Sequence, residues 1–277
     1  MRNTLPYGAC YKLTILIRAG ATTGLGVTLI YSTANNLPIQ YFSARLGTAN
    51  GLVKLGGGIG ATVMAIGVEY LIQEVGLPWT LRIFGFITLA TGIPAGIFNK
   101  DRKFGRRVTS MELSMFRNLS YTTMCIAAAI GTFTLFVPPF FLPLVARSIG
   151  LPSATGAGLV AGFNACTAVG RLTSGPLCDK LGATNVFLVT MIVAAASMLA
   201  IWPISSNLPL LAAFAVLNGW SNGAFFVAAP TVAARMFGPA RGAVAVTQSI
   251  TWWTFGYLMG EFPVGRMSKA CCCVDDT

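Results

Sequence analysis

Long apolar stretches alternate with short junctions along almost the whole chain. A helix needs about 20 mostly apolar residues to cross the hydrocarbon core of a membrane, and about eight stretches reach that length. Pro78, Pro152 and Pro209 lie near the starts of three of them, where the missing N–H of proline costs a helix least. The pattern predicts an all-α integral membrane protein with transmembrane helices at residues 13–37, 47–72, 79–98, 119–146, 153–176, 184–204, 208–235 and 243–265.

The second stretch is rich in glycine. Small residues at a spacing of four let helix backbones approach closely in lipid, so we expect Gly56, Gly60 and their neighbours to form a packing surface. The run from Gly56 to Ala61 also satisfies a dinucleotide-binding fingerprint by residue count. That fingerprint needs a preceding strand and a βαβ unit, whereas this run lies inside a predicted membrane helix, so no nucleotide cofactor is assigned.

Composition supports the membrane assignment and removes most enzymatic functions. Of the 277 residues, 55% are hydrophobic and only 10% are charged, against roughly a quarter charged in soluble proteins. The mean hydropathy of +0.70 agrees. The chain has no histidine, which excludes catalysis by Ser-His-Asp or Cys-His groups and imidazole ligation of a metal. No pair of acidic residues lies within a predicted span, so we expect neither an enzyme nor a bound cofactor.

The basic residues occupy alternate junctions. The formal net charge is +11, and the basic residues occur singly or in one short run between apolar stretches. This distribution is typical of loop charge that sets membrane topology, and not of a nucleic-acid-binding face. The positive charge at Arg45, in residues 100–107, and at Lys180, Arg235 and Arg241 predicts that these junctions face the cytoplasm.

That orientation has a consequence for the two ends of the chain. With about eight spans, both basic termini lie outside, which the positive-inside rule disfavours. An odd number of further helices at each end would bring Arg2 and Lys12, and likewise Arg266 and Lys269, to the cytoplasmic side. We therefore expect the chain to be part of a longer protein fold.

Residues 41–56 carry a family resemblance. They read Tyr-Phe-Ser-Ala-Arg-Leu-Gly-Thr-Ala-Asn-Gly-Leu-Val-Lys-Leu-Gly. This resembles the signature that enters the fifth helix of the monocarboxylate-transporter family of the major facilitator superfamily, Tyr-Phe-x-Lys-basic-(basic or Leu)-x-Leu-Ala-x-small-x-Ala-x-Ala-Gly. The matching positions are Tyr41, Phe42, Arg45, Leu46, Ala49, Gly51 and Gly56. The chain departs from the signature at Ala44, Thr48, Val53 and Leu55.

A second landmark agrees in spacing and position. Residues 170–182 read Gly-Arg-Leu-Thr-Ser-Gly-Pro-Leu-Cys-Asp-Lys-Leu-Gly, similar to the passage after the eighth helix of this superfamily, and Asp179 is its acidic residue. Aligning the two landmarks makes the predicted spans correspond to family helices four to eleven, most closely in the fungal branch. The resemblance therefore implies a partial major-facilitator fold that lacks three helices before Met1 and one after Lys269. Both numbers are odd, as the charge pattern requires.

The resemblance also implies a division into two helix bundles. Residues 1–98 would form part of the amino-terminal bundle, with family helices four to six, and residues 118–267 part of the carboxy-terminal bundle, with helices seven to eleven. Residues 99–117 would be a basic cytoplasmic loop between them. Residues 268–277 form a Cys-rich tail, for which palmitoylation near the membrane and the absence of any role are both open; its cysteines are Cys271, Cys272 and Cys273.

Arg171 is the sharpest candidate for a solute-binding residue. An arginine in an apolar span is costly unless it faces a cavity or a partner, and a guanidinium can hold a carboxylate through two hydrogen bonds. In the family the matching arginine is implicated in binding the substrate anion, while its usual acidic companion one turn earlier is Thr167 here. The alternative is that Arg171 extends toward the cytoplasmic interface, and for Lys54 we expect that extension more than a place in a cavity.

Buried amides are further candidates. Asn218 and Asn222 are four residues apart and share one helix face, and Asn164 and Gln248 are similar but weaker candidates. In lipid such amides need partners, so solute binding and interhelical hydrogen bonding are both open. Arg45 matches a family loop position, where it either stabilises a gate between helices or sets topology. The motif residues expected to serve gating are Tyr41, Phe42, Arg45, Ala49, Gly51, Gly56 and Asp179.

Together these features predict a membrane transporter, a secondary carrier in which two bundles expose a central site alternately to each side. Its expected partners are a small-molecule solute and the lipid bilayer, with no nucleic acid, and its expected location is the plasma membrane. The solute would be a small organic acid or, as in the fungal branch, a secondary metabolite for export. The alternative is a truncated, non-transporting remnant or the product of a mispredicted gene, because the loss of four helices removes much of one cavity wall.

Overall fold

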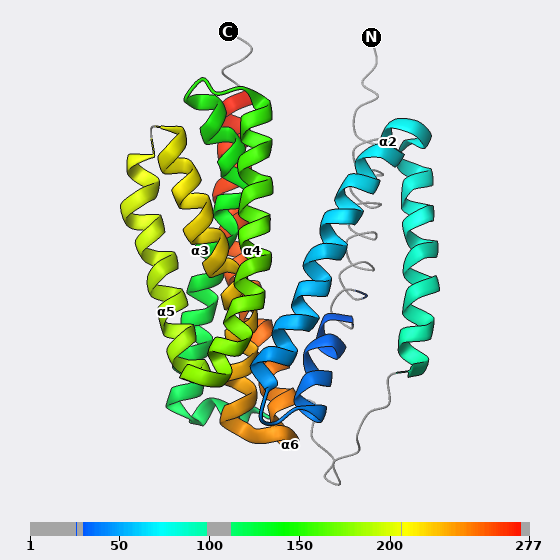
Figure 1. Ribbon diagram of the computed structural model, residues 1–277, viewed down its shortest axis with the longest axis vertical. Helices are drawn as coiled ribbons and strands as arrows, with labels where there is room; N and C mark the ends of the chain where they lie inside the picture. The colour runs from blue at the N-terminus through cyan, green and yellow to red at the C-terminus, as the bar shows by residue number, and fades with distance from the viewer. Residues whose placement is uncertain (1–25, 27–29, 99–111, 206, 273–277) are drawn as a thin grey trace, which may run out of the picture.

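The computed structural model describes Gly26 and residues 30–98, 112–205 and 207–272, and all regular secondary structure in these residues is helical (Figure 1). A helical segment at residues 30–41 comes first. It is followed by α2 (Leu46–Phe98), α3 (Leu119–Ser148), α4 (Ser153–Leu181), α5 (Ala183–Ala196) and α6 (Leu208–Cys272). A 3₁₀ turn at Leu113–Arg117 precedes α3, and α5 continues through a π turn at Ser197–Ile201 and a 3₁₀ turn at Trp202–Ile204.

Both α2 and α6 consist of two helical arms joined at a glycine. Gly76 (φ 76°) and Gly238 (φ 70°) adopt the left-handed backbone that bends the chain, which glycine does without a steric penalty. With the arms counted separately, the described residues form eight α-helical segments. Seven of them coincide with predicted spans, and the first, at residues 30–41, overlaps the end of the span predicted at residues 13–37. The predicted all-α membrane fold is confirmed in this respect.

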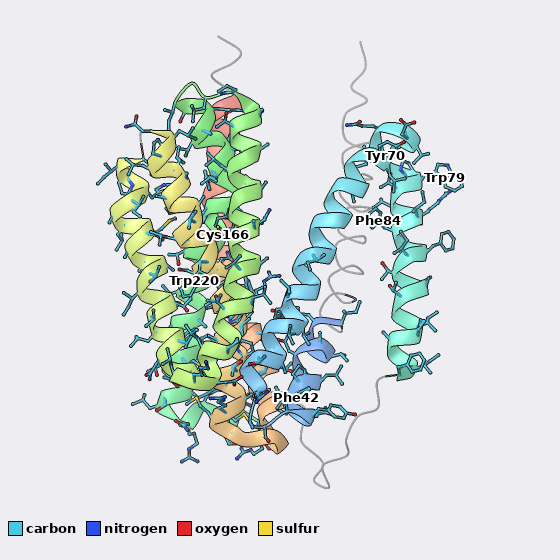
Figure 2. The ribbon with its side chains drawn as sticks, viewed as in Figure 1. Phe42, Tyr70, Trp79, Phe84, Cys166 and Trp220 are labelled. Carbon is cyan, nitrogen blue, oxygen red and sulfur yellow. The ribbon has the colours of Figure 1, made fainter. Side chains whose placement is uncertain are left out.

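Helices α3 to α6 form a bundle in which α6 packs against α3, α4 and α5 (Figure 1). The described chain has three helices that are long and apolar enough to cross a membrane, Pro78–Phe98, Ala183–Ile204 and Leu208–Gly238. The most apolar stretch of Leu208–Gly238 is 61% buried, whereas that of Pro78–Phe98 is 0% buried. The second arm of α2 accordingly stands apart from the other helices in Figure 1, and Trp79 projects away from it in Figure 2.

The bundle is held together by a core that is rich in aromatic and small side chains. Tyr121 of α3 contacts the edge of Phe237 of α6, with 5.1 Å between ring centroids, and donates its hydroxyl proton to the carbonyl of Ala245 at 2.6 Å. Phe225 and Trp253, from the two arms of α6, lie 5.2 Å apart between centroids. Many of the other buried positions are alanines, so the helix backbones approach closely.

The turns alternate between the two ends of the molecule, as the charge pattern predicts. The turn at residues 42–45, the turn at Gly182 and the bend at Gly238 lie at the lower end in Figure 1, and the bend at Gly76 and the turn at Gly150 lie at the upper end. The basic run at residues 100–107 lies outside the described residues. So do most of the first predicted span and the last residues of the tail, while α6 stays helical to Cys272, beyond its predicted end at residue 265.

Candidate functional site

A cavity of about 590 Å³ lies between the helical segment 30–41 and the first arm of α2 on one side, and α3, α4 and α6 on the other. Its apolar walls come from Ile30, Ala34, Val53, Pro139, Phe163 and Phe226. Its polar lining comes from Tyr31, Lys54, Asn164, Thr167, Arg171 and Asn222. Two of these side chains are cations, and none of the described lining residues is an acid.

A larger hollow of about 810 Å³ lies elsewhere, between residues 30–42 and the two arms of α2. Its lining is mainly apolar and includes no charged side chain among the described residues. Two of its hydroxyl groups, those of Thr88 and Thr91, donate to carbonyls of their own helix at 2.8 Å. Because the smaller cavity contains two cations and two of the predicted amides, it is the candidate solute site despite its smaller volume.

Arg171 connects the two sides of the candidate site. Its Nη1 atom, on α4, donates a hydrogen bond of 2.9 Å to the main-chain carbonyl of Lys54 on α2. Its Nε atom is buried and has no hydrogen-bond partner among the described residues. Thr167, one turn before Arg171, donates its hydroxyl proton to the carbonyl of Phe163 at 2.9 Å. The guanidinium therefore keeps an unused hydrogen-bond donor at Nε, and no carboxylate in the described part of the chain forms an ion pair with it.

Lys54 is buried in the cavity wall, with 8% of its surface exposed. Its Nζ atom donates a hydrogen bond of 2.6 Å to Oδ1 of Asn35 and lies 4.0 Å from the centroid of the Tyr31 ring. Asn35 in turn donates to the carbonyl of Tyr31 at 2.7 Å. The expectation that Lys54 extends to the membrane interface is wrong, because an amide oxygen and an aromatic face replace water around the ammonium group.

Two of the predicted amides reach the same cavity as Arg171. Asn164 of α4 is exposed, and Asn222 of α6 lines the cavity from the same side. Asn222 also donates a hydrogen bond of 2.9 Å from Nδ2 to the carbonyl of Leu135 on α3. Its amide oxygen remains as a group that a solute could meet.

The other two predicted amides lie away from the cavity. Asn218 donates from Nδ2 to the hydroxyl oxygen of Ser197 at 3.0 Å, so it joins α6 to the end of α5. Gln248 is buried, and neither its Oε1 nor its Nε2 atom has a partner among the described residues. The structure thus brings Arg171 together with Asn164 and Asn222, and separates Asn218 and Gln248 from them.

Asp179, near the end of α4, connects three helices. Its carboxylate accepts hydrogen bonds from the main-chain N–H groups of Gly47 (2.9 Å) and Thr48 (2.8 Å) and from the Thr48 hydroxyl (2.7 Å). The N–H groups in the first turn of a helix lack intrahelical partners and carry partial positive charge, so Asp179 on α4 caps α2 from outside. Arg235 on α6 completes the arrangement with an ion pair of 2.7 Å to Asp179.

Glycines let α2 and α4 cross at close range beside this contact. A Cβ atom added to Gly47 would lie 2.5 Å from the carbonyl oxygen of Gly175, and one added to Gly51 would lie 2.7 Å from that of Arg171. Lys54 and Gly58 continue the same helix face at positions seven and eleven residues after Gly47. This face, with the side chain of Lys54 on it, is the one that α2 turns toward α4.

The glycines predicted to form the packing surface point elsewhere. Cβ atoms added to Gly56 and Gly60 would meet no atom within 4 Å. Gly56 follows Gly51 by five residues, which places it about 140° away around the helix, so it cannot share that contact. The prediction of close packing was correct for this helix and wrong for these two positions.

The remaining motif residues lie around the turn before α2. Tyr41, Phe42 and Arg45 are exposed, and Figure 2 shows Phe42 at the lower end of the molecule. Ala49 lines the larger hollow and not the candidate site. Their gating role stays a prediction.

Three polar contributors were missed by the sequence analysis. Tyr31 and Asn35 surround the Lys54 ammonium group, and Asn50 donates from Nδ2 to the hydroxyl oxygen of Thr231 at 2.9 Å, which joins α2 to α6. A polar side chain in an apolar stretch is costly in lipid unless it is paired or functional. Asn35 and Asn50 each lie within a predicted apolar span, so the sequence alone could have pointed to them.

Comparison with known proteins places the chain in a family. The family model described as Major Facilitator Superfamily matches residues 124–268. The chain is 30% identical over 226 residues to MFS-type transporter 1 of an Ophiocordyceps species, which covers 80% of this chain and 50% of that protein. It is 27% identical over 220 residues to the aspyridones efflux protein apdF of Emericella nidulans, covering 79% of this chain and 45% of that protein.

A third relative is the fujikurins efflux protein of Gibberella fujikuroi, at 27% identity over 214 residues, or 76% of this chain and 46% of that protein. The chain therefore spans about half the length of the curated relatives it matches. The helical fold and the matches agree on an integral membrane protein. This chain belongs to the major facilitator superfamily.

Proposed function

We propose that this chain acts in a secondary carrier that moves anionic organic solutes across a membrane by alternating access. The observation that supports this most is the position of Arg171. It is a cation with an unused donor, in the wall of a cavity between two groups of helices, and no described lining residue is an acid. A guanidinium in such surroundings is suited to hold a carboxylate through charge-assisted hydrogen bonds.

The proposed moving parts are the groups predicted from the sequence, residues 1–98 and residues 118–267. In alternating access, one bundle rocks against the other around a central site. In the present state Asp179 caps α2, and Asn50 bonds Thr231, so both contacts hold the two groups together at the end predicted to face the cytoplasm. We propose that these contacts break when the site opens to that side and re-form when it closes.

The solute class and the branch of the superfamily are the finer parts of the proposal. The motif at residues 41–56 supports the monocarboxylate-transporter branch, and two relatives are named as efflux proteins for aspyridones and fujikurins. We propose an organic acid or an acidic secondary metabolite as the solute, export as the direction and the plasma membrane as the location. Asn164 and Asn222 would orient the uncharged part of the solute.

Transport by reconstituted protein tests the proposal. The whole chain is placed in lipid vesicles, and uptake of radiolabelled octanoate and of radiolabelled suberate, a dicarboxylate of equal chain length, is measured. We expect uptake above that of empty vesicles for at least one of the acids, and its loss in the variant Arg171→Ala. Arg82→Ala is the matched control, because Arg82 lies on the exposed second arm of α2, against Trp79.

Two results would contradict the proposal. If vesicles with the wild-type chain take up neither acid, the proposed solute class is wrong. If wild type and Arg171→Ala take up the acids equally, the proposed role of Arg171 is wrong.

A further inference from the structure

The amino-terminal side of the candidate site contains a second cation with its own supporting groups. Lys54 lies on the first arm of α2, and its partners Asn35 and Tyr31 lie on the helical segment 30–41. Lys54 and Tyr31 line the cavity together with Arg171. We infer that these residues form a second anion-binding point, and that the site takes an organic acid with two anionic groups. This inference rests on the proposed function and names the solute class more narrowly.

Charge balance is the first argument. A charge placed in a membrane interior is costly unless an opposite charge pairs with it. The carboxylates whose side chains the structure describes are engaged or distant: Asp179 pairs with Arg235, Glu112 pairs with Arg241, and Glu74 is exposed beside the Gly76 bend. Two cations therefore face one cavity without a described counter-charge. A solute with two negative charges supplies a counter-charge for each cation.

Hydrogen-bond capacity is the second argument. The ammonium group of Lys54 has three N–H donors, and one of them is used on Asn35 at 2.6 Å. The hydroxyl oxygen of Tyr31 and the Nε atom of Arg171 are buried and have no hydrogen-bond partner among the described residues. An unused donor therefore lies on each side of the cavity, the Tyr31 hydroxyl group on one and the Arg171 Nε–H group on the other. A ligand that supplies acceptor oxygens at two places would satisfy them.

The two cations have different hydrogen-bond partners, and we propose one anionic group of the solute for each cation. Arg171 reaches the main-chain carbonyl of Lys54, while the Lys54 side chain leads away to Asn35 and to the Tyr31 ring, 4.0 Å from its centroid. The apolar side chains of Ile30, Phe163 and Phe226 line the same cavity. An acid with an apolar middle and an anionic group at each end fits this lining.

The test compares two acids that differ only in their second charge. Thermal unfolding of the whole chain in detergent is followed by tryptophan fluorescence, with octanoate or suberate added over a range of concentrations. We expect suberate to give half of its maximal stabilisation at a concentration about tenfold lower than octanoate, because one further charge-assisted hydrogen bond is worth roughly that factor. Lys54→Met should remove this difference between the two acids.

Three further variants keep the test decisive. Lys54→Arg retains the positive charge and should preserve most of the preference for suberate. Tyr31→Phe should weaken the binding of suberate without unfolding the site, since only a hydroxyl group is removed. Arg82→Met removes a cation outside the cavity and should change neither response.

The outcomes separate this inference from the proposed function. In one outcome, both acids reach half-maximal stabilisation of the wild type at the same concentration, and Arg171→Ala loses stabilisation by both. That result would overturn the second anion-binding point and leave the proposed function intact. A preference for suberate that survives Lys54→Met would also overturn it. No response to either acid in wild type would count against the proposed function itself.

Discussion

Arg171 donates a hydrogen bond to the main-chain carbonyl of Lys54, 2.9 Å away, and so joins α4 to α2 beside the cavity. The acceptor is a backbone atom, so substitution of the Lys54 side chain leaves this contact in place. Substitution of Arg171 removes the interhelical contact and a cavity cation together. The two cations of the cavity therefore differ in what they do, since only Arg171 contributes directly to the contact between α2 and α4.

Asp179→Asn should loosen the lower end of the molecule. The variant loses the negative charge that pairs with Arg235 and caps α2 through Gly47 and Thr48. Hydrogen bonds to charged groups contribute about 1.5–3 kcal/mol each, so the open state should become at least about tenfold more populated. The measurement is maleimide labelling of Cys178, which is buried next to Asp179, in a chain whose other cysteines are replaced by serine.

The control for that experiment is Glu112→Gln. Glu112 pairs with Arg241 on α6, and the hydrogen bonds that its carboxylate accepts in the described part of the chain come from Arg241. Labelling of Cys178 should stay near the wild-type rate in this variant. An unchanged rate in Asp179→Asn would show that the Asp179 contact does not hold the end closed.

Gly51→Ala should destabilise the protein although alanine is the better helix former. The added Cβ atom would lie 2.7 Å from the carbonyl oxygen of Arg171, so α2 must move away from α4. Overpacking of this kind costs about 1–3 kcal/mol, against about 1 kcal/mol gained in helix propensity. Gly56→Ala is the matched control, because its Cβ atom meets open space, and its melting temperature in detergent should not fall. A fall in Gly56→Ala as large as that in Gly51→Ala would contradict the assigned crossing.

Asn218→Ala and Asn222→Ala should have different effects although the two residues share one helix face. Asn218 bonds Ser197 away from the cavity, so its loss should lower the melting temperature, at a cost of about 0.6 kcal/mol, and leave acid binding unchanged. Asn222 lines the cavity, so its loss should also raise the concentration of acid needed for thermal stabilisation. The same fluorescence titration with octanoate measures both. Equal shifts in acid binding for the two variants would refute this separation.

Gln248→Met should stabilise the protein. The amide of Gln248 is buried, and neither of its polar atoms has a partner in the described part of the chain. A buried polar group without partners costs about 1–3 kcal/mol, and methionine is similar in length without that cost. The melting temperature in detergent is the measurement, with Thr251→Val on the same arm, an exposed position, as the reference. A lower melting temperature in Gln248→Met would instead indicate a partner for this amide.

The sequence by itself determined the all-α membrane fold and the order of its helices. Apolar length sets the spans, because backbone groups in lipid must bond within a helix, and Pro78, Pro152 and Pro209 mark where three helices begin. Arg171 could also be singled out, since a cation in an apolar stretch needs a reason to be there. These features depend on each segment alone.

Only the tertiary structure decided which side chains share the cavity. The first arm of α2 is apolar around most of its circumference, so its sequence does not say which face turns inward. The close crossing at Gly47 and Gly51 decides this rotation, and it places Lys54 in the cavity wall and turns Gly56 away from α4. Contacts between distant segments, such as those of Lys54 with Asn35 and of Asp179 with α2, arise from that rotation and from the helix crossing, which no single segment specifies.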